Sequence, residues 1–407
     1  MRRGLAVLLA AAMGCGGPDT PRSAGEPESD KSFHYDEEAL SAAPEVTVGS
    51  IQEVGGTDPG EGNLYMVSGA TLLPSGEVVV ANRGTYQLRI YSPQGVLART
   101  TGQRGGGPGE FEMLVGTWRS PSGQILAWDP SQRRMTVFDI DGEMDRVRTV
   151  QENFFNPPRV VGMTPEGFVL VHEHFQSPAE PDQFVDLPAD YLYVSFDGEV
   201  RDTIATVPWR RVMRPSKMRG GVVLPRIFDA SVEGAAGADG LYFGVASKPE
   251  ITAYSLKGHR RWIAGWDAPL PTVGEDLVQQ WVKERAGRDA GPEQRRPFEE
   301  WRDNVGAADR LPAFSQLIVA STGDLWIKPY RWPRSVEPLR WIILKSTGAL
   351  AGTAVLPGDM RLLEVGEDYL LGLQLDAFES EHVYVVSLTH SLKDGDSRSE
   401  GVGGGVR

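Results

Sequence analysis

The chain has 407 residues, a formal net charge of −14 and 40% apolar residues. This acidic balance argues against a nucleic acid as the main partner, because binding a polyanion depends on clustered Lys and Arg. With 48 Gly, 29 Pro and 10 Trp, the composition favours short strands and tight turns over a helical bundle. The length allows two or three ordinary domains or one closed β architecture.

Residues 1–14 have the pattern of a secretion signal. A basic start, Met1-Arg2-Arg3, precedes an apolar run from Leu5 to Ala12 that is too short to span a bilayer. Cys15, the one cysteine of the chain, follows directly. This arrangement resembles a bacterial lipobox, although Ala12 stands where such motifs usually have Leu. The resemblance implies that Cys15 is lipidated and becomes the mature N-terminus; the alternative is an ordinary secretion signal with an incidental cysteine.

The residue after the cysteine bears on the destination. Gly16 follows Cys15, where an Asp would be expected in a lipoprotein kept at the inner membrane. The resemblance therefore implies an exported protein anchored at the cell envelope, in the outer membrane of a bacterium with two membranes. Residues 15–43 are rich in Gly, Pro, Ser and acid, and we expect a disordered tether there. Residues 393–407 are expected to form a disordered tail.

A repeat follows the tether. Residues 67–111 and 114–150 match at an offset of 47: Ser75-Gly76 corresponds to Ser122-Gly123, Asn82 to Asp129, and Tyr91 to Phe138. Each unit alternates four short apolar runs with turn signals. Strands and turns repeating at this period are typical of the blades of a β-propeller.

The glycine-rich stretch GQRGGGPGEF, residues 102–111, separates these two units. A phosphate-binding P-loop would need Lys and Ser or Thr after its last glycine, followed by a helix. Here Gly109 is followed by Glu110-Phe111 and a strand. The stretch is therefore predicted to connect the outer strand of one blade to the inner strand of the next.

The same turns recur more weakly downstream. The first turn returns at Gly167, Gly240, Gly323 and Gly366, and the second at Gly198, Gly258 and Gly348. The sixth unit ends after its third strand, Val383–Leu388. We expect Val46–Gly55 to supply the missing outer strand, which predicts an all-β, six-bladed β-propeller over residues 44–392, closed by its N-terminal strand.

The stretch GEVVVANRGTYQLRIYSPQGVLARTTGQRGGGPGEF, residues 76–111, resembles the NHL repeat. In that repeat a strand ending in Ala-Asp or Ala-Asn precedes a polar loop and an Arg-Ile/Val-x-x-Phe/Tyr strand. The match is specific over residues 67–150 and limited to the turns from 160 to 390. The resemblance, to the bacterial lipoprotein branch of six-bladed propellers, implies the same fold and an anchored envelope protein.

Propeller topology places the loops after second and fourth strands on one face. All long segments belong to this class: Gln176–Pro188, Trp209–Pro225, Ala268–Pro312 and Tyr330–Pro338. Loops on a rigid scaffold commonly carry binding residues. The insertion at 268–312, between blades four and five, has helical periodicity at Glu275–Ala286 and Glu293–Val305, which fits either a lid or a cap that only packs on neighbouring blades.

His172-Glu173-His174 ends a predicted strand. Strand alternation would point both imidazoles to one side, where they could bind a metal with a third ligand from another blade. Spacing alone favours the alternative, in which both histidines are polar side chains that face the solvent and bind no metal.

Two loop segments are candidates for ligand binding. Residues 209–219 form a basic patch that includes Arg210 and Arg214, and residues 330–334 contain Tyr330, Arg331 and Trp332. Arg, Tyr and Trp are enriched at recognition surfaces, so the two segments together could form a binding rim. The alternatives are a solvated basic loop and aromatic residues that pack at blade edges.

Two functions remain open. The first is a non-enzymatic scaffold, a monomer that binds a protein, peptide or glycan with the face that carries the long loops after second and fourth strands. The second is a metal-dependent hydrolase or lactonase of the gluconolactonase type, which needs Glu, Asn and Asp side chains converging in the central channel. The expected inner strands are mostly apolar, and HExxH, GxSxG and CxxC motifs are absent. No catalytic residue or cofactor is assigned.

Overall fold

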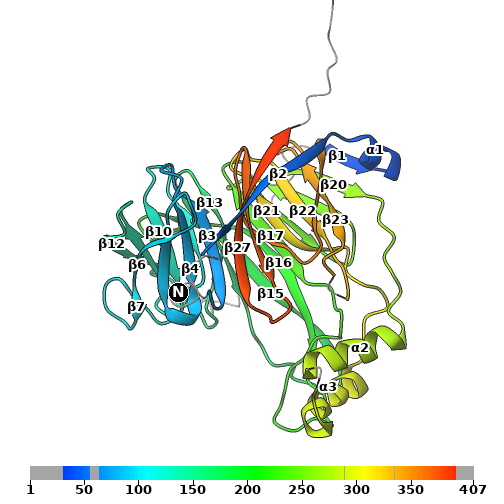
Figure 1. The fold of residues 1–407 in the computed structure, drawn as a ribbon. Coiled ribbons are helices and arrows are strands. Elements are labelled where there is room, and N and C mark those ends of the chain that lie inside the picture. Colours follow the sequence, from blue (N-terminus) through cyan, green and yellow to red (C-terminus); the bar gives the residue numbers. More distant parts are fainter. Residues whose placement is uncertain (1–30, 56–63, 288, 334, 391–407) are drawn as a thin grey trace, which may run out of the picture.

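The computed structural model describes residues 31–55, 64–287, 289–333 and 335–390, and the fold there is all-β and propeller-like (Figure 1). The secretion signal, Cys15 and the C-terminal tail lie outside these residues. In the described ranges, no helix combines the length and the apolar character that crossing a bilayer requires.

Four antiparallel sheets follow one another along the chain, each with its strands in sequence order. The first contains β3 (Val67–Leu72), β4 (Val78–Asn82), β5 (Gln87–Tyr91) and β6 (Leu97–Thr101). The second contains β9 (Thr117–Arg119), β10 (Ile125–Asp129), β11 (Arg134–Phe138) and β12 (Met144–Thr149). The third contains β13 (Arg159–Thr164), β14 (Gly167–Glu173), β15 (Phe184–Ser195) and β16 (Val200–Met213). The fourth contains β17 (Val232–Gly237), β18 (Gly240–Val245), β19 (Glu250–Tyr254) and β20 (Arg260–Trp266), with β1 (Lys31–Tyr35) added at its edge.

The remaining strands form one eight-stranded sheet in the order β21-β22-β23-β24-β2-β27-β26-β25. Its strands are β21 (Phe314–Val319), β22 (Leu325–Pro329), β23 (Pro338–Leu344), β24 (Leu350–Pro357), β25 (Arg361–Val365), β26 (Tyr369–Leu375), β27 (Glu381–His390) and β2 (Glu45–Val54). Strand β2 pairs antiparallel with β27 from Val46↔His390 to Val54↔Val383, which confirms the expected pairing of the N-terminal strand. It also pairs parallel with β24 over two residues, Glu45 and Val46, which was not expected.

The first strands of several neighbouring sheets lie next to one another. Strand β3 contacts β9 and β25, β17 contacts β13 and β21, and β21 also contacts β25. Gly162 of β13 shows how close these strands approach, since a Cβ there would meet the carbonyl oxygen of Ala236 at 1.9 Å. The apolar core lies between neighbouring sheets; for example, Trp128 of the second sheet packs on Phe168 of the third at 5.9 Å.

The glycine-rich stretch connects the first sheet to the second, as predicted. Its short strands β7 (Gln103–Arg104) and β8 (Glu110–Phe111) pair in parallel before β9 begins. The carbonyl oxygens of Gly106 and Gly107 accept hydrogen bonds from the Arg134 guanidinium at 3.1 and 2.9 Å. The Gly107 N–H donates to the Glu110 carboxylate at 2.8 Å. A phosphate is an anion that needs hydrogen-bond donors. This stretch instead presents a carboxylate and carbonyl oxygens, which are hydrogen-bond acceptors, so it is not suited to bind a phosphate.

The prediction of a disordered tether over residues 15–43 is wrong for residues 31–43. Strand β1 pairs parallel with β20, and α1 (Glu37–Ala42) follows with Asp36 as its N-cap. Leu40 is buried in the core around the fourth sheet, and the Tyr35 hydroxyl donates to the Gly348 carbonyl at 2.7 Å. The segment as a whole is polar, so its few apolar residues did not indicate a folded structure. These residues become buried only because the segment packs on the edge of a sheet formed by other strands. Residues 15–30 lie outside the described residues.

Two of the four expected long loops are partly strand. In the third sheet, β15 and β16 continue past their neighbours as a two-stranded ribbon, with Phe184 opposite Met213 and Leu187 opposite Arg210. Figure 1 shows this ribbon extending toward the helices. Polar and proline residues suggested loops here, but pairing between the two strands satisfies their backbone groups.

The helices of the insertion were predicted correctly: α2 spans Glu275–Ala286 and α3 spans Pro292–Val305. Trp281 of α2 packs edge-on against Phe298 and Trp301 of α3, at 5.9 and 5.1 Å. The Trp301 indole N–H donates to the Pro225 carbonyl at 2.8 Å. The pair is therefore fixed to the segment that follows the β15–β16 ribbon.

Candidate functional site

The loops after second and fourth strands meet at one end of the sheets, which we call the long-loop face. Contacts between loops of different sheets support this placement. Gly84 donates to the Tyr65 carbonyl at 2.9 Å, the Phe154 and His172 rings lie 4.9 Å apart, and Ile227 forms a bridge with Ala307.

Several exposed apolar side chains lie in the loops of this face. The four most conspicuous are aromatic: Tyr65, Phe155, Phe175 and Phe378 are 64%, 80%, 47% and 89% exposed. Each precedes a first strand or follows a second strand, so each belongs to the long-loop face. The other exposed apolar residues of these loops and adjoining strand ends are Met66, Val222, Val245, Val336 and Leu375. Among the described residues, no large aromatic side chain is comparably exposed on the opposite face.

The structure places the predicted basic residues in different roles. Arg210 is exposed and lies over the Trp209 ring at 4.4 Å. Arg214 instead donates to the carbonyls of Pro178 and Ala179 at 3.1 and 2.7 Å, which fastens the neighbouring loop. The structure leaves Arg210 as the solvent-facing member of the pair.

Residues 330–332 are engaged in packing. Tyr330 and Trp332 join the apolar cluster of α2 and α3, and Trp332 contacts Phe228 edge-on at 5.5 Å. Arg331 donates to the Glu337 and Pro338 carbonyls at 2.8 and 3.2 Å. The alternative considered from the sequence, aromatic residues as packing, describes this segment well. Their role in ligand binding remains a prediction.

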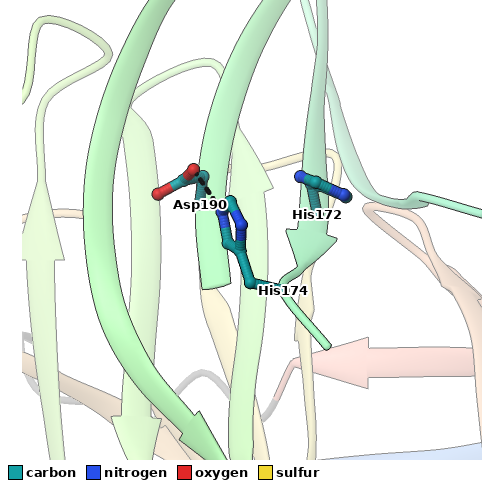
Figure 2. Close-up of side chains that lie close together, drawn as sticks. All are labelled: His172, His174 and Asp190. Atoms are coloured by element: carbon teal, nitrogen blue, oxygen red, sulfur yellow. Dashed lines mark hydrogen bonds and ion pairs between the residues drawn. The ribbon is translucent and has the colours of Figure 1, made fainter. Parts of the chain in front are cut away.

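His172 and His174 do point to the same side of the sheet, and a third polar group joins them (Figure 2). Asp190 of β15 lies directly opposite His172 of β14 in the strand register. Each of the three residues offers one potential ligand atom, and these atoms lie within 4.8 Å of one another. We expected a third ligand from another blade; Asp190 comes from the adjacent strand of the same sheet.

Each member of this group has distinct partners. The His174 Nε2 lies 2.6 Å from Asp190 Oδ2, and the Thr206 hydroxyl donates to Asp190 Oδ1 at 2.6 Å. The His172 Nε2 is buried and has no hydrogen-bond partner among the described residues. Burial, reinforced by the neighbouring His174, lowers the pKa of His172, which favours the neutral imidazole. Asp190 could have been found from the sequence only if its strand had been paired with His172.

Charged groups also lie on the first strands, which the sequence suggested to be mostly apolar. Glu233 of β17 accepts a hydrogen bond from the Ser231 hydroxyl at 2.8 Å, and burial raises its pKa. Glu364 of β25 accepts hydrogen bonds from the Thr71 and Tyr369 hydroxyls, and burial raises its pKa as well. These two carboxyls do not form a metal-binding group: within the described part of the chain, only His172, His174 and Asp190 bring three His, Cys, Asp or Glu ligand atoms together.

Comparison with known proteins finds no matching family model and no similar curated protein. Solved structures are similar in fold. A member of the DUF4221 family from Bacteroides vulgatus has 11% identity and a TM-score of 0.50, with 86% of this chain and 99% of that chain covered. A protein of Bacteroides fragilis named as exported has 11% identity and a TM-score of 0.47, covering 89% and 100%. A gluconolactonase from Xanthomonas campestris has 12% identity and a TM-score of 0.37, covering 85% and 98%. At these identities the likeness concerns the fold alone.

Proposed function

We propose that this protein is a six-bladed β-propeller of the NHL type, exported and anchored at the cell envelope, that binds a protein or peptide with its long-loop face. The count of six treats each half of the eight-stranded sheet as one blade, β21–β24 and β25–β27 with β2. The strand order supports this count, since β2 joins the halves through only two parallel pairs. The repeat over residues 67–150 supports the NHL relation.

The observation that carries the proposal is the exposed apolar set of the long-loop face. Exposed apolar patches mark interaction surfaces, and we infer that these loop side chains contribute to one. Tyr65, Phe155, Phe175 and Phe378 would lose unfavourable exposure on binding, and aromatic side chains often supply most of the binding energy at interfaces. The aliphatic residues among them favour a protein or peptide over a glycan, and the net charge of −14 disfavours a nucleic acid.

The test compares two surface variants that should fold alike. Phe155→Ser, Phe175→Ser and Phe378→Ser are combined in one chain, and the control combines Val96→Ser with Ile140→Ser, two exposed residues in turns on the opposite face. Cross-linking in the native envelope, followed by identification of the linked species, measures binding. We expect the aromatic variant to lose the linked partner by about 30-fold or more, since an anchor contributes about 2 kcal/mol. Loss in the control, or full retention in the aromatic variant, would contradict the proposed face.

Arg210 is the second element to test, as the exposed member of the predicted rim. If the partner is acidic at its edge, Arg210→Glu should slow association and weaken its dependence on salt. Arg214→Glu is not an equivalent test, because it also removes the hydrogen bonds to Pro178 and Ala179.

A further inference from the structure

The His172–His174–Asp190 group has a geometry that partner binding does not explain. Two imidazoles and one carboxylate from adjacent strands place their ligand atoms within 4.8 Å of one another (Figure 2). The strand pairing fixes two of the three, since His172 and Asp190 are direct register partners. His174 is two residues further along the same side. The backbone therefore holds the three side chains close together before any ligand arrives.

One atom of the group is poorly satisfied. Within the described part of the chain the buried His172 Nε2 has no hydrogen-bond partner, and leaving a buried polar atom unpaired is unfavourable. The Phe154 ring at 4.9 Å limits the freedom of the imidazole on one side, and the His174 ring lies at 4.7 Å on another. A cation bound between the imidazoles would supply the missing partner.

The carboxylate is also supported in the way metal ligands usually are. The Thr206 hydroxyl donates to Asp190 Oδ1 at 2.6 Å, which leaves Oδ2 to face His174. Such outer hydrogen bonds orient a ligand and keep its charge directed at the ion. Thr206 lies opposite Asp190 on β16, so the support comes from a third strand of the same sheet.

We propose that His172, His174 and Asp190 bind one divalent first-row transition ion of the zinc class. Two imidazole nitrogens and one carboxylate oxygen are a ligand set for Zn²⁺, whereas Mg²⁺ and Ca²⁺ prefer oxygen ligands throughout. A tetrahedral zinc site separates its ligand atoms by about 3.3 Å, given bonds of about 2.0–2.1 Å. The His174 Nε2 and Asp190 Oδ2 are now 2.6 Å apart. To reach the separation of a tetrahedral site, the distance between these two atoms would have to increase by less than about 1 Å.

Three protein ligands leave a fourth position open. The His174 and Asp190 side chains are 43% and 23% exposed, so water can reach the ion. The site lies where β14 ends, on the long-loop face, with the exposed Phe175 next in the chain after His174. The fourth ligand would be water or a donor atom of a molecule bound there. The metal site does not depend on the proposed partner binding.

The experiment measures Zn²⁺ binding directly. The full chain, without a polyhistidine tag and carrying Cys15→Ser so that no thiol remains, is stripped with a chelator and titrated with Zn²⁺ against a chromophoric competitor. We expect one saturable site, with Mg²⁺ and Ca²⁺ unable to compete. His172→Ala, His174→Ala and Asp190→Asn should each weaken binding by about 100-fold or more, and Thr206→Val by about 10-fold.

The matched control is His382→Ala, which removes a histidine that is also paired with carboxylates, those of Glu53 and Asp376, outside the proposed site. It should leave the zinc affinity unchanged. Circular dichroism confirms that each variant is folded, and Asp190→Asn keeps the shape of the side chain if the alanine variants unfold. Absence of saturable binding at micromolar Zn²⁺, equal competition by Mg²⁺, or equal affinity in Asp190→Asn and the parent chain would overturn the proposal.

Discussion

At the scale of single residues, His382 links β27 to β2, two strands that are far apart in the sequence. Its Nδ1 lies 2.7 Å from Glu53 on β2, and its Nε2 lies 3.5 Å from Asp376, while its ring stacks on Tyr384. The hydrogen bond with Glu53 raises the pKa of His382, which burial opposes in part and Asp376 increases further. The folded state therefore favours the protonated imidazole.

This pKa shift predicts a pH-dependent stability. A histidine whose pKa is raised on folding stabilises the protein fully below its unfolded pKa, about 6.5, and the contribution is lost as the pH rises through the folded value. Urea unfolding of the parent chain and His382→Gln should differ most near pH 6, by about 0.5–1 kcal/mol because the groups are partly exposed, and converge in alkaline buffer. A difference that grows with pH would show that the ion pair has been misassigned.

The candidate site shows what single residues reveal in a sequence. The alternation of His172 and His174 was enough to place both imidazoles on one side of a strand. Asp190 could not be found in the same way, because its closeness to His172 depends on the pairing register of β14 with β15, two strands that a loop separates in the sequence. Likewise, nothing in the sequence indicates that the Arg214 and Arg331 side chains donate hydrogen bonds to backbone carbonyls.

At the scale of elements, the turns were the most informative signals. Gly76 and Gly123 have φ values of +82° and +86°, which only glycine adopts easily, so the Ser-Gly pairs located the hairpins directly. The helices of the insertion were readable because their apolar spacing repeats over several turns. Strand β1 and the β15–β16 ribbon were missed, since their stability comes from pairing with strands distant in sequence or from tertiary packing.

Strand β2 provides a test of ring closure with a control on the same strand. Val54 is 2% exposed and packs between the eight-stranded sheet and the first sheet, whereas Ile51 is 61% exposed. Val54→Asp would bury an unpaired charge and should lower the free energy of unfolding by about 3–5 kcal/mol. Ile51→Asp should change it by about 0.5 kcal/mol or less. Thermal or urea unfolding measures both, and equal effects would argue that β2 does not close the structure.

At the scale of the whole molecule, the sequence predicted an all-β propeller-like body with its loops sorted between two faces. The exposed aromatic residues then distinguish these faces, a feature that composition could not reveal because an exposed and a buried phenylalanine look alike in a sequence. The boundary of the body was misplaced by about a dozen residues at its N-terminal side, where β1 and α1 belong to the fold.

The proposed localisation of the protein, anchored at the cell envelope, can be tested by fractionating cells. Cys15→Ser removes the thiol that lipidation requires, and we expect the variant to move from the membrane pellet to the soluble fraction. Fractionation with an antibody to the propeller measures the change, and Ser23→Ala serves as a neighbouring control that should stay in the pellet. Unchanged pelleting of the Cys15→Ser chain would refute lipid anchoring.

The pairing of β2 with β27 also has a kinetic consequence. Val46 and His390 are register partners although more than 300 residues separate them, so this contact has one of the largest loop-closure entropies in the protein. Pairings with such sequence separation form slowly and late. Until synthesis reaches β27, the β2 segment has no antiparallel partner, and only its two-residue parallel pairing with β24 can form. The eight-stranded sheet can therefore be completed only after its last strand has been made, and it remains incomplete in the nascent chain until then.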